Sequence, residues 1–285
     1  MTIVLRAPFR KLLSLRKPPR CLRTRTPLYH PDFPLVLFWS EKAGCTLVVK
    51  WFFAQVGLLA QAQAYGRWIH RYELEVYKAR SGYRHDLWAA LRSGSHTGVK
   101  VVRDPWRRAV SAFLILAERG AVNGRNHWVK THWNQVDAWL ADRGEDPLRG
   151  ISFMEHLTMV AAAEAGQSRP VNLHMSPQFV DGEERFVGQR VPIETFRKFC
   201  DSLPCEVARP VDWDALERSG HHHFTDEAVT EALGPQPEEA KITRGAFADG
   251  RFPDPQVFVN ERSSPAIRAA YAADFNAYGE LYRGG

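Results

Sequence analysis

A single lysine, Lys42, stands in a short polar loop between two apolar segments. Residues 35–39 have the continuous apolar pattern of a buried strand, and a helix is predicted from residue 45. A turn between strand and helix directs backbone N–H groups, and the positive end of the helix dipole, at a bound anion. Lys42 adds a full positive charge, Gly44 permits close backbone approach, and Thr46 offers a hydroxyl. We therefore predict a phosphate site here, although the same order also occurs in ordinary α/β structure and the loop is not a Walker A sequence.

A second strand-to-helix junction follows at residues 98–113. Asp104 is a good N-cap and Pro105 fits the first helical position, so the helix should begin two residues after the strand. Four residues of this helix share one core-facing stripe at helical spacing: Trp106, Val110, Phe113 and Leu114.

The polar residues of this junction have the types that bind a second phosphate. Arg103 is left at the end of the strand, and Arg107 or Arg108 should share an outward face of the helix with Ser111. Guanidinium groups and a hydroxyl beside a helix start suit a phosphate, although Arg-Asp-Pro alone also describes a capped helix.

Together the two segments resemble the PAPS-dependent sulfotransferases, most closely the carbohydrate branch that includes the chondroitin and dermatan sulfotransferases. That family has a proline-lysine-x-x-cysteine-threonine type loop for the 5′-phosphosulfate, and the matching residues here are Lys42, Ala43, Gly44, Cys45 and Thr46. Its R-D-P-x-x-R-x-x-S motif for the 3′-phosphate is matched by residues 103–111. Glu41 stands where the family usually has proline.

The resemblance implies transfer of a sulfuryl group from PAPS (3′-phosphoadenosine 5′-phosphosulfate) to an acceptor hydroxyl, on a carbohydrate or glycolipid. Because the departing nucleotide gains negative charge during in-line transfer, catalysis depends on alignment and charge neutralisation. We expect Lys42 at the bridging oxygen, the loop N–H groups and Thr46 on the 5′-phosphate, and Arg103 and Ser111 on the 3′-phosphate. We expect no metal.

Two weaker matches lie downstream. Residues 172–178 look like the family's H-W-x-P-Q element with methionine in place of tryptophan, and residues 267–279 resemble its terminal Y-x-x-D-F helix. We expect His174, in the first of these, to be the general base that takes the hydroxyl proton. The alternative is His85, because a heparan-type branch of the superfamily places its base between the two phosphate motifs. A structural or substrate-positioning role for His174 also stays open.

Two other functions are compatible with these segments. The first is a nucleotide- or polyanion-binding protein that uses the same pockets without transfer. The second is a P-loop nucleotide kinase, which should require Mg²⁺ and prefer ATP; the absence of a Walker lysine-serine pair and the Arg103 and Ser111 motif argue against it.

The net charge of +6 is unevenly distributed along the 285 residues. Eight of the 38 basic residues fall in residues 1–27 without an acidic one, which leaves 30 basic against 32 acidic residues in the remaining chain. A nucleic-acid-binding body is therefore not supported. We interpret residues 1–30 as a basic, flexible segment with three open roles: contact with an anionic membrane surface, a transit peptide, or a solvated tail.

No apolar run reaches the roughly 18 to 20 residues that span a membrane, so we expect no membrane anchor, and peripheral membrane contact only through the basic segment. The four cysteines form neither a disulfide framework nor a zinc pattern, so we expect a reduced, cytoplasmic setting. We interpret His221, His222 and His223 as part of a surface loop-to-helix segment and not as a metal site. The sequence does not indicate the oligomeric state.

The predicted fold class is α/β, with a parallel β-sheet flanked by helices and a P-loop-like strand-loop-helix for phosphate, as in sulfotransferases and P-loop NTPases. We expect one domain over residues 31–285. The expected strands are 34–39, 98–103, 185–189 and a short one near 205–208. The expected helices are 45–62, 86–92, 105–119, 133–141, 151–165, 194–202 and 264–280.

Overall fold

The computed structural model describes residues 18–117, 127–217, 233–244 and 253–282. The chain forms two compact units, of which the first comprises Met1–Arg103 and Gln178–Ser219, and the second Asp104–Pro177 and Gly220–Gly285. The basic residues 1–17 and the triple histidine at 221–223 lie outside the described residues. The expectation of one domain over residues 31–285 stays a prediction.

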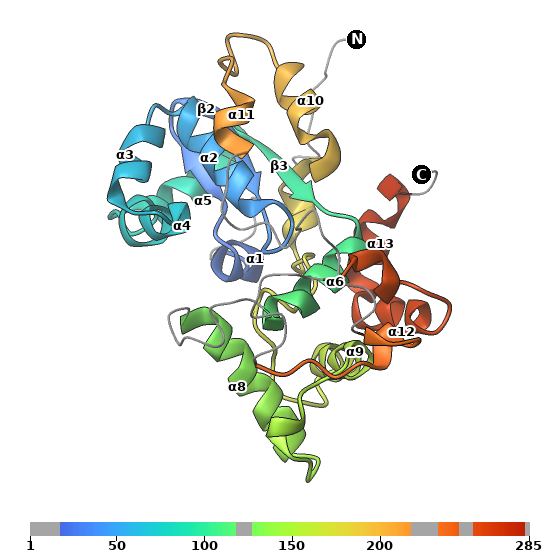
Figure 1. Ribbon diagram of the computed structural model, residues 1–285. Helices are drawn as coiled ribbons and strands as arrows, with labels where there is room; N and C mark the ends of the chain where they lie inside the picture. Colours follow the sequence, from blue (N-terminus) through green and yellow to red (C-terminus); the bar gives the residue numbers. More distant parts are fainter. Residues whose placement is uncertain (1–17, 118–126, 218–232, 245–252, 283–285) are drawn as a thin grey trace. The chain divides into compact units, whose positions relative to one another are not determined.

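The first unit contains a four-stranded, mostly parallel sheet (Figure 1). Its strands are β1 (Leu28–His30), β2 (Phe33–Phe38), β3 (Thr97–Val102) and β4 (Val187–Pro192), in the order β1-β2-β3-β4. β1 runs antiparallel to β2, while β2, β3 and β4 are parallel, with Leu37 opposite Val99 and Val101 opposite Val191. This confirms the predicted α/β class with a parallel sheet. The carboxyl ends of β2, β3 and β4 therefore lie at one edge.

Helices accompany the sheet in the first unit: α1 (Arg20–Thr24), α2 (Cys45–Gln55), α3 (Leu59–Tyr65), α4 (Ile69–Tyr72), the π-helix η2 (Glu73–Tyr77), α5 (Tyr83–Ser93), the 3₁₀ helices η5 (Glu183–Arg185) and η6 (Ile193–Thr195), α10 (Phe196–Asp201) and α11 (Trp213–Glu217).

Two expectations for these elements are wrong. The helix predicted over 45–62 divides at Gly57, whose φ of 73° ends α2, and the N–H of Leu58 returns to the carbonyl of Phe53 at 2.7 Å. The short strand near 205–208 is a turn instead, because the N–H groups of Val207 and Ala208 both donate to the carbonyl of Pro204.

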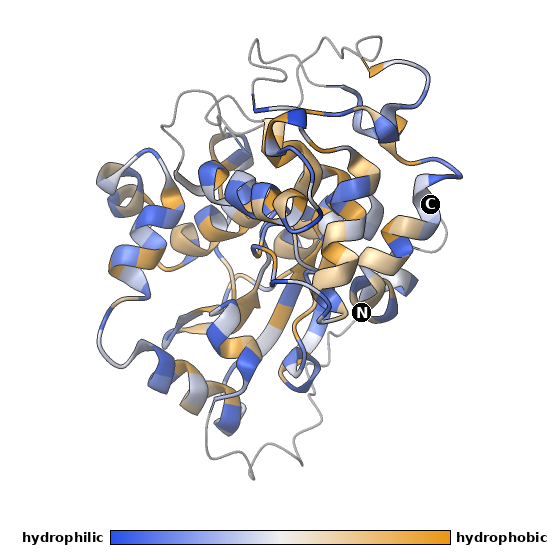
Figure 2. Ribbon diagram, turned by 90° about the horizontal axis from the view of Figure 1, so that it is seen from below, coloured by the Kyte–Doolittle hydropathy of each residue, from blue (hydrophilic) through white to orange (hydrophobic). Residues whose placement is uncertain are grey.

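Aromatic packing fixes α2 on the sheet. Phe33 of β2 makes edge contacts with Trp51 and Phe52 of α2, and Trp51 contacts Phe196 of α10. All four aromatic side chains are buried. The helices carry both hydrophobic and hydrophilic residues, as amphipathic helices do (Figure 2). The loop between β2 and α2 is therefore held at both of its ends.

Residues 18–30, which we interpreted as part of a flexible segment, form α1 and β1 in the structure. Cys21 and Leu22 are buried in the core of the first unit, and the Tyr83 hydroxyl donates to the carbonyl of Pro27 at 2.8 Å. The prediction rested on the basic residues and overlooked the apolar side chains between them.

The second unit is built mainly from helices: α6 (Pro105–Leu114), η3 (Ile115–Ala117), α8 (His127–Ala141), η4 (Pro147–Arg149), α9 (Phe153–Glu164), η8 (Pro237–Glu239), η9 (Pro255–Phe258), α12 (Ser263–Ala270), α13 (Ala272–Tyr278) and η10 (Gly279–Tyr282). The Asp104 side chain accepts from the N–H groups of Trp106 and Arg107, which confirms the predicted cap of α6. The helix expected over 264–280 divides at Tyr271, where ψ is 30°.

His156 on α9 is fully buried in the second unit beside Phe113, with neither ring nitrogen hydrogen-bonded. Burial, together with the nearby His132, lowers the pKa of His156 to about 3. In the unfolded chain the histidine takes up a proton near pH 6.5, so below that pH the unfolded state binds a proton that the folded state does not. His156 therefore costs stability as the pH falls from 6.5 towards 3.

We expect His156→Leu to remove this cost. The difference in unfolding free energy between His156→Leu and wild type should favour the variant by about 2 kcal/mol more at pH 5.0 than at pH 7.5. The reason is that each pH unit below about 6.5 costs the folded wild type about 1.4 kcal/mol. Urea unfolding at both pH values measures this. Equal slopes for wild type and His156→Leu would contradict the assignment.

Candidate functional site

The candidate site lies in the first unit, at the carboxyl edge of the parallel strands. The loop 39–44 follows β2, Arg103 follows β3, and Ile193 follows β4. In open parallel sheets, ligands bind outside this edge. The sheet thus brings together the loop, which we predicted to bind the 5′-phosphate, and Arg103, which we predicted to bind the 3′-phosphate.

The loop backbone has two left-handed residues. Lys42 has a φ of 63°, and within the described ranges no other residue except glycines has a positive φ. A non-glycine residue pays about 1–2 kcal/mol for this conformation, which persists only where its surroundings hold it. The N–H of Ala43 donates to the carbonyl of Ser40 at 3.2 Å and closes the turn.

Gly44, with a φ of 75°, is the N-cap of α2. A Cβ at this position would lie 2.4 Å from Cδ1 of Ile193, so a larger residue would displace the Ile193 side chain as well as strain the backbone. Glycine is therefore required for the close packing of the loop against the end of β4.

Arg103 holds the loop through its side chain. Its Nη1 donates to the carbonyl oxygen of Lys42 at 3.0 Å, so the guanidinium stabilises the left-handed residue. The backbone of Arg103 is fixed in turn by Gln178, whose Oε1 accepts from the Arg103 N–H at 3.0 Å and whose Nε2 donates to the Arg103 carbonyl at 2.7 Å. The fully buried glutamine thus continues the pairing of β3 beyond its last residue.

The backbone carbonyl of Gln178 accepts several hydrogen bonds. It accepts from Ser40 at 3.1 Å and from Lys100 at 3.0 Å, and Lys100 pairs with Glu183 at 3.0 Å. Gln178 is the last residue of the H-W-x-P-Q-like segment 172–178, and its sequence context predicted no role for it. Its function here is to position the loop and Arg103.

Glu41, which stands where the resemblance to sulfotransferases predicts a proline, is neutralised by Arg25. The Arg25 Nε lies 2.6 Å from the Glu41 Oε2, and both side chains are largely buried. The carboxylate is therefore compensated within the first unit. Arg25 was counted only as part of the basic segment, and a pair separated by 16 positions leaves no local signal in the sequence.

His70 of α4 lies against the first turn of α2. Its Nε2 is 3.5 Å from the Thr46 hydroxyl, and its Nδ1 is 2.6 Å from the Glu73 carboxylate. The hydroxyl predicted for the 5′-phosphate thus has a histidine beside it. Sequence reasoning missed His70, although the three-residue spacing from Glu73 was a usable signal.

Ser111 is partly exposed on α6, in the second unit. Of the two arginines proposed to share its outward face, Arg107 is exposed. Arg108 is not: it is fully buried, its Nη1 is 3.9 Å from the carboxylate of Asp274, and its guanidinium faces the Tyr271 ring. The outward placement of Arg108 is therefore wrong, because α13 supplies a buried carboxylate to receive it.

His174 lies in a turn of the second unit that is organised by Asn172. The Asn172 Oδ1 is 2.9 Å from the His174 Nδ1 and accepts from the His174 N–H at 3.0 Å. The ring of His132 from α8 lies 5.0 Å from the His174 ring. The same turn is held by the Tyr271 hydroxyl, which donates to the carbonyl of Met175 at 2.9 Å.

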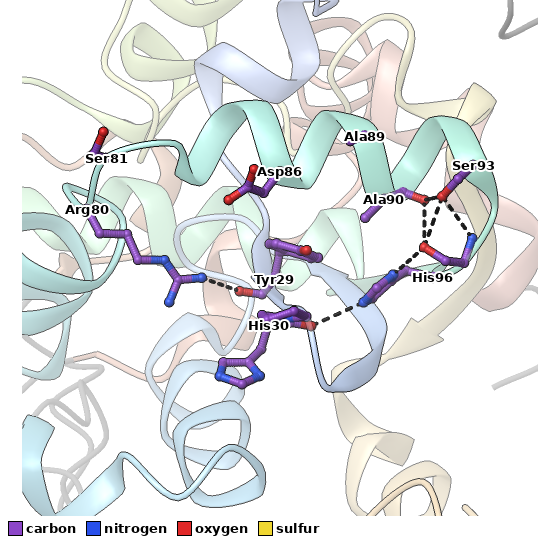
Figure 3. A pocket seen from close by; sticks show the side chains of 11 residues that line it. Tyr29, His30, Arg80, Ser81, Asp86, Ala89, Ala90, Ser93 and His96 are labelled. Atoms are coloured by element: carbon purple, nitrogen blue, oxygen red, sulfur yellow. Dashed lines mark hydrogen bonds between the residues drawn. The ribbon is translucent and has the colours of Figure 1, made fainter.

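His85 projects from α5 into solvent in the first unit, with Asp86 3.1 Å away. A neighbouring surface cavity of about 630 Å³ does not include it (Figure 3). The polar groups of that cavity satisfy one another: the His96 Nε2 donates to the carbonyl of His30 at 3.1 Å, and Arg80 reaches the carbonyl of Tyr29 at 3.5 Å. None of the predicted site residues lines it.

Comparisons with protein-family models, with curated proteins and with solved structures find no match. Within the described ranges, no group of three or more histidine, cysteine, aspartate or glutamate side chains could hold a metal ion. Among the same residues, no helix is long and apolar enough to cross a membrane.

Proposed function

We propose that this protein is a PAPS-dependent sulfotransferase that transfers a sulfuryl group to an acceptor hydroxyl on a carbohydrate or glycolipid. The observation that carries the proposal is the hydrogen bond from Arg103 to the carbonyl of Lys42. It brings the ends of the two strand-to-helix junctions together at the carboxyl edge of a parallel sheet, where anionic ligands bind in α/β folds.

The roles of the residues follow from the charge that develops during transfer. The acceptor oxygen forms a bond to sulfur as the bond from sulfur to the bridging oxygen breaks, and Lys42 neutralises the bridging oxygen. The N–H groups of the loop and of the first turn of α2 hold the 5′-phosphate. This strand-loop-helix would therefore bind phosphate through backbone N–H groups, as a P-loop does. Arg103 serves the 3′-phosphate. The assignment of Ser111 to that phosphate stays a prediction.

Thermal shift separates this proposal from its alternatives, because a ligand of the folded state raises the melting temperature by mass action. Adenosine 3′,5′-bisphosphate should stabilise the protein more than AMP, and more than ATP with Mg²⁺. Preference for ATP and Mg²⁺ would favour a nucleotide kinase. Selective bisphosphate binding without transfer from PAPS to any carbohydrate or glycolipid acceptor would leave a nucleotide-binding protein.

Arg103→Ala should weaken bisphosphate binding by about ten- to a hundredfold, since a charge-assisted hydrogen bond is worth roughly 1.5–3 kcal/mol. Part of this loss comes from the loop, because the variant also releases the Lys42 carbonyl. AMP, which lacks the 3′-phosphate, should lose less affinity. Isothermal titration with both nucleotides measures the difference.

Arg185→Ala is the matched control, because Arg185 is exposed and precedes β4, at the opposite edge of the sheet. It should bind both nucleotides as wild type does. Unchanged bisphosphate affinity in Arg103→Ala would show that the second motif has been misassigned.

A further inference from the structure

Thr46, His70 and Glu73 form a hydrogen-bonded series of side chains in the first unit, which leads from the start of α2 into the core. Thr46 is the second residue of α2 and is partly exposed. Its hydroxyl oxygen lies 3.5 Å from the His70 Nε2, and the His70 Nδ1 lies 2.6 Å from the Glu73 Oε2. Thr46 is the hydroxyl that we predicted for the 5′-phosphate, and the proposed function gives His70 and Glu73 no role.

Consecutive helical turns align His70 with Glu73. His70 belongs to α4, and η2 begins at Glu73 three residues later, so the two side chains share a face. The π-helix then brings Lys78 back to the same carboxylate: the backbone N–H of Lys78 donates to the Glu73 carbonyl oxygen at 2.8 Å, and the Lys78 Nζ donates to the Glu73 Oε1 at 2.5 Å. Both oxygens of the buried carboxylate are therefore hydrogen-bonded.

Two tryptophan rings hold the imidazole in place. The ring centres of Trp39 and Trp68 lie 5.3 Å and 5.6 Å from that of His70, and only 6% of His70 is exposed. Trp39 is the first residue of the loop 39–44, and its ring in turn packs under the Lys78 ammonium group, 5.1 Å from the ring centre. The imidazole is therefore fixed against the loop, with Nε2 directed at Thr46 and Nδ1 at Glu73.

Glu73 determines which nitrogen of His70 carries a proton. Burial would raise the pKa of Glu73, but Lys78 and His70 lower it below its usual range. An ionised carboxylate can only accept hydrogen bonds, so the His70 Nδ1 carries the proton that it donates to Glu73. Nε2 is the nitrogen that remains for the Thr46 hydroxyl.

The Thr46 hydroxyl has one proton to donate and two lone pairs that accept. If a neutral His70 accepted that proton through Nε2, the hydroxyl would present only lone pairs to a phosphate and would repel it. If His70 is protonated, its Nε2–H donates to the Thr46 oxygen, and the hydroxyl proton is available to the phosphate. A phosphate at the start of α2 therefore favours donation from His70, whose charge the Glu73 carboxylate compensates.

We propose that His70 is a positioning residue for the 5′-phosphate: oriented by Glu73, it donates to the Thr46 oxygen and so turns the Thr46 hydroxyl proton towards the phosphate. This inference rests on the proposed function, because it places the 5′-phosphate of the nucleotide at the start of α2. It extends the phosphate site into the segment between the two predicted phosphate motifs. Recognition of the 5′-phosphate then depends on a histidine that acts through Thr46.

The test compares two mononucleotides that differ only in the position of the phosphate, AMP (the 5′-phosphate) and 3′-AMP, by calorimetric titration of the full chain. Thr46→Val removes the hydroxyl and should weaken AMP binding by about ten- to a hundredfold, the loss expected for one hydrogen bond to a charged group. His70→Leu should weaken AMP binding by about tenfold. His70→Gln, which keeps an N–H donor, should recover part of that loss. Each variant should bind 3′-AMP as wild type does.

A double variant tests whether His70 acts through Thr46. If it does, Thr46→Val combined with His70→Leu should bind AMP as Thr46→Val alone does, within about twofold, because the second change removes an interaction that is already lost. Losses that multiply would overturn the proposal. So would unchanged AMP binding in folded His70→Leu, or equal losses for AMP and 3′-AMP, which would mark a purely structural role.

Circular dichroism and melting curves establish that each variant is folded. If His70→Leu does not fold, Glu73→Gln decides in its place, because it keeps the shape of the side chain and removes the charge that supports donation from His70; it should weaken the binding of AMP and not that of 3′-AMP. Failure of the proposed function has a different result. Wild type that binds neither mononucleotide overturns both proposals, whereas binding of both with unaffected His70 and Glu73 variants refutes the role of His70 alone.

Discussion

Replacing Lys42 by alanine is expected to lower sulfuryl-transfer turnover by about three orders of magnitude while changing bisphosphate affinity much less. Lys42 faces the bridging oxygen in our proposal, and that oxygen gains its negative charge only as the bond to sulfur breaks. A group that acts chiefly in the transition state affects turnover more than binding. Steady-state kinetics at saturating PAPS, with calorimetric binding of the bisphosphate, separate the two quantities.

The backbone of Lys42 provides the control for this prediction. Its φ of 63° strains any residue other than glycine, so Lys42→Gly relieves the strain that Lys42→Ala retains. Both variants lack the ammonium group and should be equally inactive. Lys42→Arg keeps the charge in another geometry and should recover only part of the turnover. Loss of binding with normal turnover at saturation would instead make Lys42 a docking residue.

Replacing His174 by alanine is expected to lower turnover by about two to four orders of magnitude with bisphosphate binding nearly intact, the usual loss when a general base is removed. The hydrogen bond with Asn172 engages the His174 Nδ1. Asn172→Ala should therefore reduce turnover less than His174→Ala does, because it loosens the ring without removing it. Single-turnover transfer assays with preformed PAPS complex measure the chemical step directly.

His85→Ala is the matched comparison. His85 is exposed on α5 with Asp86 as its neighbour, and we expect this variant to keep nearly full turnover. An active His174→Ala with an inactive His85→Ala would reassign the base to the segment between the two phosphate motifs. His174 would then have a role in positioning the acceptor.

The sequence predicted the central strands well because their signal is local. β2 is an apolar run, β3 is apolar from Val99 onward except for Lys100, and most residues of both strands are buried. β4 was predicted at 185–189 and is observed at Val187–Pro192. Its polar residues Gln189 and Arg190 interrupt the apolar run, since β4 is the last strand of the sheet. β1, with three residues, is too short for any periodicity.

The sequence predicted roles only for residues that lie within one of the two strand-to-helix junctions. Asp104 and Gly44 have roles that follow from their immediate neighbours. Gln178 acts on Arg103 from 75 positions away, and Arg25 acts on Glu41 across the intervening strands. Such contacts depend on how distant segments fold together, so no spacing rule along the chain reveals them.

The position of β1 has a practical consequence for engineering this protein. A variant shortened to begin at residue 31, where the sequence suggested a domain boundary, would lose β1 together with Arg25. β2 would become an unprotected sheet edge of the kind that promotes aggregation, and the Glu41 carboxylate would lose its ion pair with Arg25. Truncated variants should therefore retain the chain from α1 onward, and any that do not should precipitate during purification.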